Sequence, residues 1–405
     1  MTRALVRACP VCSNDRGDVR HVQTLAIPDE LGFADGFAVV TCSRCGFAFA
    51  DIAITQQQLD QSYEEHSKYA DETLLADAAS SDPPWDTERL AGVAAWLSEQ
   101  IQERDLRILD AGCAGGSFLG SMKAHGFSSL VGIDPSPRAA AIARRRHGVE
   151  AVAESFLAMP AALGSFGLVT LHHTLEHLGN VRGAVAALRS VLDDDGLAYL
   201  EVPNARCYAD YLTSPFQDFN TEHINHFSLA TLDRLMQSAG FVAVALGEKT
   251  IFASSRHQYP AAFGLWRKDI ASESLATVAY DEPLVEGIVR YISESHALMA
   301  QIDAALRNSL SSSDAVYLWG TGQLAFKLAR DTVLATKQVT FVDGSPEKQG
   351  LHINGSAIIA PADVAADDRP IVLGSILAAD SIAAAIRGRF GDDRRIVRLP
   401  ERVPA

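Results

Sequence analysis

The stretch Leu106–Phe118, LRILDAGCAGGSF, constrains most strongly what this chain can fold into. Arg107–Leu109 predicts a short strand that Asp110 ends, and a turn with three glycines, among them Gly112 and Gly115, leads into a helix. Glycine adopts positive φ readily, and it lets the backbone approach a ligand closely because it has no Cβ. Open α/β sheets bind ligands at such a turn, beyond the carboxyl end of a strand. The stretch therefore predicts an α/β fold with a ligand site at this turn.

A second acid follows the glycine turn at a spacing that suits a nucleoside. Leu130–Ile133 predicts a buried strand that ends in Asp134, about 20 residues past the glycines, where a carboxylate can hold a ribose diol. Two alternatives stay open: a nicotinamide-dinucleotide site and a purely structural turn. The dinucleotide fingerprint is G-x-G-x-x-G, whereas this chain has D-x-G-x-x-G, with an acid two residues before the first glycine.

Predicted strands and helices alternate from about residue 85 to 250. Asp86 can cap an amphipathic helix whose apolar residues, from Leu90 to Ile101, recur at helical spacing. Glu154 follows a short strand, where its carboxylate could accept from an adenine amino group; a solvated side chain is the alternative. The alternation predicts a parallel, doubly wound sheet. The further expected elements are helices over 138–147 and 181–192, strands over 150–153, 166–171 and 197–202, and a turn over 193–196.

Four of the six cysteines form two Cys-x2-Cys pairs, Cys9 with Cys12 and Cys42 with Cys45. Four thiolates at this spacing suit a tetrahedral zinc ion. We expect a zinc ribbon in a first unit, residues 1–80. So small a unit buries little apolar surface, and bound metal would supply its folding energy. A structural zinc is favoured over a catalytic one, which would leave a position open for water.

A polar stretch, residues 56–72, predicts a helix that carries Tyr63 and Tyr69. Two functions are open for these phenols: they could pack against neighbouring elements, or they could form a lid over the ligand pocket. As a lid, Tyr69 would contact the cofactor and Tyr63 the substrate. The prolines of the next stretch, residues 81–85, predict a linker.

A second unit is expected over residues 81–255 and a third over 256–405. The third repeats the order of strand, glycine turn and helix: Gly320 and Gly322 follow one predicted strand, and Asp343 ends the next. A glycine turn beside a helix N-terminus favours a pyrophosphate group. A nucleotide site at this turn is the prediction, and a divergent structural repeat without a ligand is the alternative.

Residues 218–228, DFNTEHINHFS, crowd titratable side chains into one segment after the last strand predicted for the second unit. Loops at that edge of a sheet commonly carry reactive groups. A histidine is the default general base near neutral pH, so His223 is the candidate base, with Glu222 to orient it. The alternative is a polar surface loop, or His226 stacked under Phe227.

Composition and charge narrow the classes of function. The chain has 405 residues and a formal net charge of −15 at pH 7, so a long interface with a nucleic-acid backbone, which needs a basic footprint, is not expected. No apolar run is long enough to span a bilayer, and the N-terminus lacks the apolar core of a signal peptide. We therefore expect a cytoplasmic protein that acts on a small molecule, with neither nucleic-acid nor membrane partners.

Two segments and the order of the units carry a resemblance to a known family. LDAGCAGGSF followed by VGIDPSP resembles motifs I and II of the class I S-adenosylmethionine (SAM)-dependent methyltransferases. The zinc ribbon, an HHTLEH segment, the EHINHFS loop and a second nucleotide-binding-like half resemble, over all three units, the sugar C-methyltransferases that act on nucleotide-linked 4-keto-6-deoxyhexoses. The expected architecture is a class I methyltransferase sheet between a zinc ribbon and a second Rossmann-like domain.

The motifs and the resemblance together imply a SAM cofactor, a structural zinc ion and a nucleotide-sugar substrate. The predicted SAM site comprises Asp110, Gly112, Gly115, Asp134, Pro135, Glu154, His173 and Tyr69. The predicted catalytic residues are His223, Glu222 and His177. The predicted substrate contacts are Tyr63, Asn204, Gly320, Gly322, Asp343 and Lys348, the last four toward the nucleotide.

The expected reaction is methylation of C3 of the sugar. The 4-keto group acidifies the proton on C3, His223 removes it, and His177 or Asn204 stabilises the enolate. Two departures from the family pattern concern the substrate: Thr221 stands where a tyrosine is expected, and residues 252–256 read FASSR where a Gly-Gly-Ser run is expected.

Three other functions compete with this prediction. The first is methylation of an oxygen or nitrogen of another small molecule, which the missing tyrosine keeps open. The second is methylation of an RNA base, in which the zinc module would bind the RNA. The acidic net charge and the large C-terminal half argue against this function. The third is a scaffold protein that keeps the fold without activity.

Overall fold

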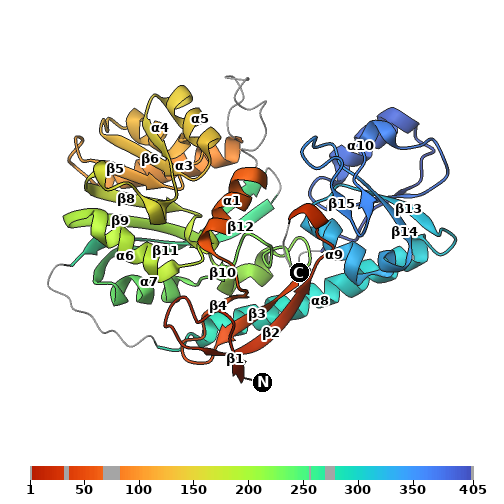
Figure 1. Ribbon diagram of the computed structural model, residues 1–405, viewed down its shortest axis with the longest axis horizontal. Coiled ribbons are helices and arrows are strands. Elements are labelled where there is room, and N and C mark those ends of the chain that lie inside the picture. The colour runs from red at the N-terminus through yellow and green to blue at the C-terminus, as the bar shows by residue number, and fades with distance from the viewer. Residues whose placement is uncertain (1, 32–35, 67–82, 255–256, 270–278, 403–405) are drawn as a thin grey trace. The chain divides into compact units, whose positions relative to one another are not determined.

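The computed structural model describes residues 2–31, 36–66, 83–254, 257–269 and 279–402. It is an α/β fold with two separate α/β sheets, one in yellow and green and one in blue in Figure 1. Among the helices described, none combines the length and apolarity that a membrane span needs. The chain packs into two compact units: Met1–Asp18, Thr41–Cys207 and Glu222–Glu286 form the first, and Val19–Val40, Tyr208–Thr221 and Gly287–Ala405 form the second.

The first unit is built on a seven-stranded sheet in the order β11-β12-β9-β8-β5-β6-β7 (Figure 1). Strands β7, β6, β5, β8 and β9 run parallel, whereas β12 runs antiparallel to both of its neighbours. The expected α/β sheet is confirmed, with the difference that it is mixed. The strands are β5 (Ile108–Ala111), β6 (Leu130–Asp134), β7 (Glu150–Ala153), β8 (Phe166–His172), β9 (Leu192–Pro203), β11 (Phe241–Ser254) and β12 (His257–Lys268).

Burial explains the sequence pattern of these strands. Every residue of β5, β6 and β8 is buried, and most of them are apolar, as is usual for parallel strands covered on both faces. The edge strand β11 instead alternates exposed and partly buried residues over Val242–Thr250. The predicted turn over 193–196 lies inside β9, where the register to β8 shifts and Asp195 has a φ of 63°.

Helices pack on this sheet. Residues of α3 (Pro84–Gln100), α4 (Ser117–Ala124) and α5 (Pro137–His147) share one apolar core with strand residues such as Leu168 and Tyr199. Proline is at the start of α3, so Asp86 is not the cap that was predicted; it lies in the first turn, where a carboxylate suits the helix dipole. The other α-helices among the described residues of this unit include α1 (Gln56–His66), α6 (Val181–Val191) and α7 (Leu229–Ser238).

The hairpin of β11 and β12 crosses the boundary predicted between residues 255 and 256. Its two strands pair from Phe241 with Lys268 to Ser254 with His257, and β12 also pairs with β9. The methyltransferase-like sheet therefore extends to Lys268, beyond the predicted end of the second unit.

The described residues of the predicted zinc unit, residues 1–80, divide between the two compact units. Its sheet has the order β1-β2-β3-β4-β10, and the last strand comes from the predicted reactive loop. The residues of the two cysteine pairs group with the methyltransferase-like sheet, whereas residues 19–40 group with the C-terminal half. The strands are β1 (Thr2–Ala4), β2 (Arg16–Thr24), β3 (Gly36–Cys42), β4 (Ala48–Asp51) and β10 (Asn225–His226).

The C-terminal half is a second α/β sheet, in the order β14-β13-β17-β18 with all pairs parallel. This confirms the second Rossmann-like domain. Its core includes Tyr317, Val342, Leu373 and Ile386. The elements are α8 (Glu282–Ser309), β13 (Ala315–Trp319), α9 (Gln323–Asp331), β14 (Gln338–Val342), β15 (His352–Ile353), β16 (Ser356–Ala357), β17 (Ile371–Leu373), α10 (Ala379–Phe390) and β18 (Ile396–Val397).

Candidate active site

The turn between β5 and α4 has the backbone that its glycines predict. Gly112 and Gly116 have φ values of 77° and 81°, which glycine adopts without strain. The N–H of Gly112 donates to the carbonyl of Ile133 at 2.8 Å, which ties the turn to the end of β6. A Cβ on Gly112 would lie 2.5 Å from Oγ1 of Thr174, so no larger residue fits. Gly115 is buried in the same turn.

Asp134 ends β6 and faces this turn. Its two carboxylate oxygens accept from the N–H groups of Ala114 and Ser136, both at 2.9 Å. Each oxygen keeps a lone pair, so the carboxylate can also accept from ribose hydroxyls. Burial raises the pKa of Asp134 to about 6. The predicted Pro135 is half-buried beside it, and the exposed Glu154 donates its N–H to the carbonyl of Asp134 at 3.0 Å. These three predicted residues lie together at the carboxyl edge of the sheet.

Asp110 is enclosed rather than open to a ligand. Its side chain accepts from Oγ1 of Thr170 at 2.7 Å and lies 3.9 Å from Nε2 of His172. Burial raises the pKa of Asp110 to about 7. Asp110 therefore links β5 to β8, and this position does not support the predicted contact with SAM.

Tyr63 packs against the helix that follows β6. Its partly buried side chain contacts a small apolar cluster of Ala139 and Ile142, together with Ala114 of the glycine turn. This is the packing alternative of the sequence analysis, realised next to the cofactor turn. Tyr69, the other predicted lid residue, lies outside the described residues.

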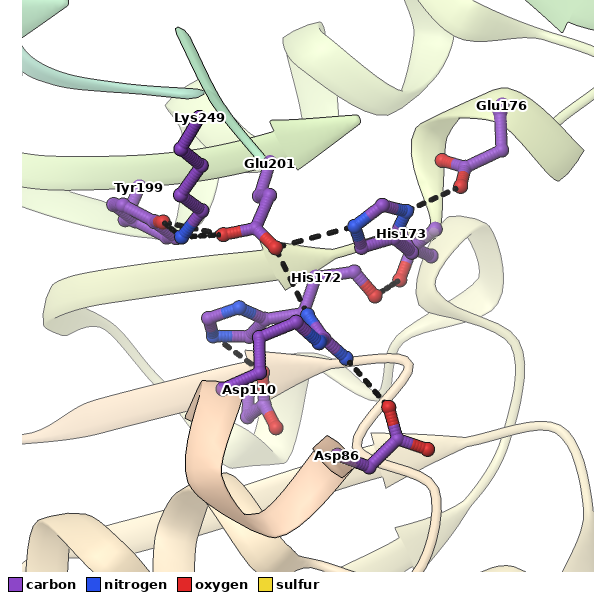
Figure 2. A network of polar contacts seen from close by, with 10 residues as sticks. Asp86, Asp110, His172, His173, Glu176, Tyr199, Glu201 and Lys249 are labelled. Carbon is purple, nitrogen blue, oxygen red and sulfur yellow. Dashed lines mark hydrogen bonds and ion pairs between the residues drawn. The ribbon is translucent and has the colours of Figure 1, made fainter. Parts of the chain in front are cut away.

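Glu201 is the centre of a buried charge network at the carboxyl end of β9 (Figure 2). Its oxygens accept from Arg89 at 2.9 Å, Lys249 at 2.5 Å, Tyr199 at 2.7 Å and His173 at 3.1 Å. Burial alone would raise the pKa of Glu201, but the hydrogen bond from His173 and the charge of Lys249 hold it well below its usual range. The carboxylate is therefore ionised near neutral pH and gathers basic groups from three elements.

His173 connects this network to a second buried acid, Glu176 (Figure 2). Its Nδ1 lies 3.3 Å from Oε1 of Glu176, and its Nε2 contacts Glu201. Burial alone would lower the pKa of His173, but the bonds to two carboxylates raise it. Both ring nitrogens of His173 thus contact carboxylates, and its predicted contact with the cofactor stays a prediction.

Glu176, His177 and His223 place side-chain nitrogen and oxygen atoms within 4.8 Å of one another. The first two belong to the 3-10 turn η5 (Leu175–His177) after β8. The rings of His177 and His223 meet edge to face, with centroids 4.9 Å apart. Burial lowers the pKa of His223 to about 3, and the charge of His177 acts in the same direction. Burial alone would raise the pKa of Glu176, but His173 and His177 lower it to about 2.

This trio can move a proton. A neutral imidazole next to an ionised carboxylate can act as a general base, because the carboxylate stabilises the imidazolium that forms. Two imidazoles and one carboxylate could also hold a divalent metal ion. The predicted Glu222 is exposed and contributes its backbone, since its carbonyl accepts from Nδ1 of His177 at 3.0 Å. The acid of the trio is Glu176, which the sequence analysis did not single out.

Asn204 and His226 take structural positions instead. Asn204 is buried, and its amide donates to Oε1 of Glu248 on β11 at 2.9 Å. The predicted role of Asn204 as an enolate donor thus competes with a bond inside the sheet. His226 is fully buried on β10, and burial lowers its pKa to about 3.

The four predicted zinc ligands converge. Sγ atoms lie 3.6 Å apart between Cys9 and Cys45 and 3.5 Å apart between Cys12 and Cys42, and all four lie within 4.8 Å of one another. Tetrahedral zinc with bonds of about 2.3 Å needs sulfur atoms about 3.8 Å apart, so the cluster fits the ion. The N–H of Arg44 also points to Sγ of Cys42 at 3.4 Å, a bond that stabilises a thiolate.

Zinc removal should be visible in composition and stability. We expect one zinc ion per chain by elemental mass spectrometry and none in Cys45→Ser, whose melting temperature should fall by roughly 6–12 °C for a loss of about 3 kcal/mol. Cys207→Ala, outside the cluster, is the matched control and should keep both the metal and the melting temperature. A Cys45→Ser protein that still carries one zinc ion per chain would contradict this assignment.

The C-terminal sheet repeats the geometry of turn and acid. Gly320, with a φ of 93°, follows β13, and Gly322 precedes α9. Asp343 accepts from the N–H of Thr321 at 2.8 Å and from its hydroxyl at 2.6 Å. Nζ of Lys348 donates to the carbonyl of Thr321 at 3.2 Å and lies 3.4 Å from the carboxylate of Asp343. The structure thus brings together all four residues predicted in this half.

A comparison with protein families identifies the first sheet. A family model described as a methyltransferase domain matches residues 85–246. This range begins at α3, contains the glycine turn and the trio, and ends within β11. No curated protein sequence matches the chain.

Solved structures resemble part of the chain at low sequence identity. Magnesium protoporphyrin IX methyltransferase from Synechocystis PCC 6803, with bound SAM, is 14% identical, with a TM-score of 0.39, over 54% of this chain and 99% of that one. The N-methyltransferase NodS from Bradyrhizobium japonicum is 18% identical, with a TM-score of 0.37, over 49% of this chain and 97% of that one. At such values the likeness says nothing about a substrate, and the assignment rests on the family match.

The family match and the site agree with each other. The matched range carries the glycine turn and the acid after the second strand, in a seven-stranded sheet with one antiparallel strand. The chain is therefore a SAM-dependent methyltransferase of the class I fold.

Proposed function

We propose that the protein methylates C3 of a nucleotide-linked 4-keto-6-deoxy sugar, through an enolate. The observation that carries the proposal is the trio of Glu176, His177 and His223, which begins just after Thr174, the residue that contacts the glycine turn. Methyl transfer to a nucleophile that is already reactive needs no base of this kind, whereas transfer to carbon requires that a C–H proton is first removed.

The residues of the first turn fit SAM, which supplies an electrophilic methyl group when bound. Asp134 would accept from the ribose hydroxyls through the lone pairs that its two N–H bonds leave. Gly112 and Gly116 would let the backbone lie close to the cofactor. The exposed Glu154 would face the adenine amino group at the end of β7.

His223 would remove the C3 proton. Its imidazole is neutral near pH 7, because burial lowers its pKa, and so it has a lone pair to offer. The ionised Glu176 would stabilise the imidazolium that forms. His177 donates from Nδ1 to the carbonyl of Glu222, so its Nε2 carries a proton only when the ring is protonated. In that state His177 would donate to the enolate oxygen.

The C-terminal half would hold the nucleotide of the substrate. Asp343 accepts from an N–H of its glycine turn and from the N–H of Ser345, two residues further along the chain. Asp134 makes the same pair of bonds in the first sheet, to Ala114 and Ser136. This shared geometry, with Lys348 beside the acid, favours a nucleotide over a purely structural repeat.

Mass spectrometry of zinc-loaded protein with SAM and a panel of nucleotide-linked 4-keto-6-deoxyhexoses tests the proposal. We expect a product heavier by one methyl group, which NMR places on C3. A methyl group on oxygen or nitrogen would establish the alternative that the departure at Thr221 favours. No methylated product from any sugar of the panel, with SAM binding intact, would remove the substrate assignment and leave the cofactor assignment standing.

Gly112→Ala should weaken SAM binding. The new Cβ would meet Oγ1 of Thr174 at 2.5 Å, and a φ of 77° would strain alanine, so the turn must move. We expect a loss of affinity of about tenfold or more by calorimetry. Gly126→Ala is the control: its φ is 90°, but the nearest heavy atom is 4.0 Å from the new Cβ. It should cost about 1 kcal/mol of stability and leave SAM affinity unchanged. Equal SAM affinity in both variants would contradict the assignment of the turn.

A further inference from the structure

We infer that the zinc-binding segment positions the catalytic loop: Arg7 holds the loop that carries Glu222 and His223, and Asn225 is the residue through which the loop is held. Both are positioning residues that act through His177 and His223. The inference rests on the proposed roles of these two histidines. It gives the zinc-binding segment a function in the reaction, although the four cysteines would fill every position around a tetrahedral ion.

Arg7 reaches two segments that follow strands β8 and β9 of the methyltransferase-like sheet. Its guanidinium donates to the carbonyl of Gly179 at 2.7 Å and to Oδ1 of Asn225 at 2.9 Å, with longer bonds of 3.4 Å to the carbonyls of Leu178 and Ile224. A guanidinium is always charged near neutral pH, so these bonds are charge-assisted. One planar guanidinium thus clamps the segment after η5 to the catalytic loop.

Asn225 completes the clamp from the side of the loop. Its side chain is buried, and its amide donates to the carbonyls of Leu178 at 2.8 Å, Glu176 at 3.2 Å and Leu175 at 3.3 Å. These carbonyls belong to the turn that carries Glu176 and His177, or follow it directly. The side chain of Asn225 therefore donates to the carbonyls of this turn and accepts from Arg7. These bonds fix the distance between His177 and His223.

The zinc-binding segment also pairs with the catalytic loop through backbone hydrogen bonds. Asn225 and His226 form β10, which pairs antiparallel with Phe49 and Ala48 of β4. The N–H of Ala50 donates to the carbonyl of Ile224 at 3.0 Å, and the N–H of Ile224 donates to the carbonyl of Glu176 at 3.1 Å. The residue next to His223 is thus bonded on one side to the module and on the other to η5.

Both cysteine pairs lie close in the sequence to the residues that make these contacts. Arg7 precedes Cys9 by two residues, and β4 begins three residues after Cys45. The N–H groups of Val6 and Arg7 donate to Oδ1 of Asp51, the last residue of β4, at 2.8 and 2.9 Å. Zinc would tie the two ends of this clamp together, because it joins a cysteine of each pair.

The test compares Arg7→Ala with Arg3→Ala. Arg3 also binds Asp51, at 2.7 Å, but its side chain is on the exposed side of the module and gives a matched loss of one arginine. Arg7→Ala should lower kcat by about ten- to a hundredfold, since small displacements of reacting groups cost that much. Its SAM affinity and its zinc content should match wild type. Arg3→Ala should keep kcat, and Arg7→Lys should recover part of it, because lysine lacks the planar fork.

Amide hydrogen exchange separates this inference from the proposed function, because it needs no acceptor substrate. Amides of residues 223–226 should exchange at least about tenfold faster in Arg7→Ala and in chelator-treated protein than in wild type or Arg3→Ala. Unchanged exchange in Arg7→Ala would overturn the inference, as would a loss of SAM affinity that parallels the loss of kcat. Faster exchange in a protein that methylates no 4-keto sugar would support the clamp and reject only the proposed substrate.

Discussion

Replacing His223 with alanine should lower kcat for methyl transfer by about 10²–10⁴-fold, the usual contribution of a positioned base, while SAM affinity stays within about twofold of wild type. The reason is that His223 is the neutral imidazole of the trio, and its contacts are to His177 and Glu176 rather than to the glycine turn. Steady-state kinetics with saturating SAM, combined with calorimetry of SAM binding, measures both quantities.

His125→Ala is the matched control for this variant, because His125 is exposed at the end of α4 and should leave both quantities unchanged. The same experiment separates a base from a metal ligand. If Glu176, His177 and His223 held a divalent ion, protein freed of loosely bound metal would recover activity only on addition of that ion. A kcat for His223→Ala within a few-fold of wild type would remove His223 as the base.

Replacing Glu201 with alanine should lower the free energy of unfolding by about 3–5 kcal/mol, because it leaves buried cations without their shared counter-ion. Arg89, Lys249 and His173 all contact this carboxylate (Figure 2). Denaturation in urea measures the loss. Asp210→Ala is the control, since its carboxylate is half-exposed and its ion pair with Arg290 should contribute no more than about 1 kcal/mol. An equal loss of unfolding free energy in the two variants would contradict the role of Glu201 as the shared counter-ion.

Glu201→Gln keeps the size of the side chain and tests the charge if the alanine variant fails to fold. The pH dependence of the unfolding free energy gives a second test. Because two carboxylates raise the pKa of His173 in the folded state, its contribution to stability is complete below about 6.5 and is lost as the pH rises through the raised value. That loss should be smaller in Glu201→Gln, where one of the two carboxylates is gone. An identical pH dependence in both proteins would show that His173 does not depend on Glu201.

The first half of the sheet could be predicted from sequence because its signals are local. A glycine turn and two apolar runs that each end in an acid give β5, β6 and the cofactor turn within a residue or two of the observed bounds. The cluster of four cysteines could also be predicted, because the spacing of metal ligands is visible in the sequence. Its members are Cys9, Cys12, Cys42 and Cys45.

The buried charge network could not be predicted in the same way. Arg89, Glu201 and Lys249 come from α3, β9 and β11, which are far apart in the chain, and only the folded sheet brings them together. One signal was present: Glu201 interrupts the apolar run of β9, and a charge in a buried strand requires a partner. The same reasoning applies to Glu176, which stands three residues after His173 on a tight turn.

The extension of the sheet to β12 could not be predicted from local signals either. The pairing of β12 with β9 joins segments that are far apart in the chain. The apolar residues of Tyr259–Trp266 were the available sign of another core strand.

Exchange of the C3 proton of the sugar with solvent tests the central claim most directly. The protein would be incubated in D₂O with S-adenosylhomocysteine, which cannot donate a methyl group, and with the 4-keto sugar that it methylates; NMR would then follow deuterium at C3. We expect wild type to introduce deuterium at C3 and His223→Ala to introduce none above the rate without protein. If wild type methylates the sugar but exchanges no C3 proton, or if the variant exchanges it as fast, then His223 does not generate an enolate and the account is wrong.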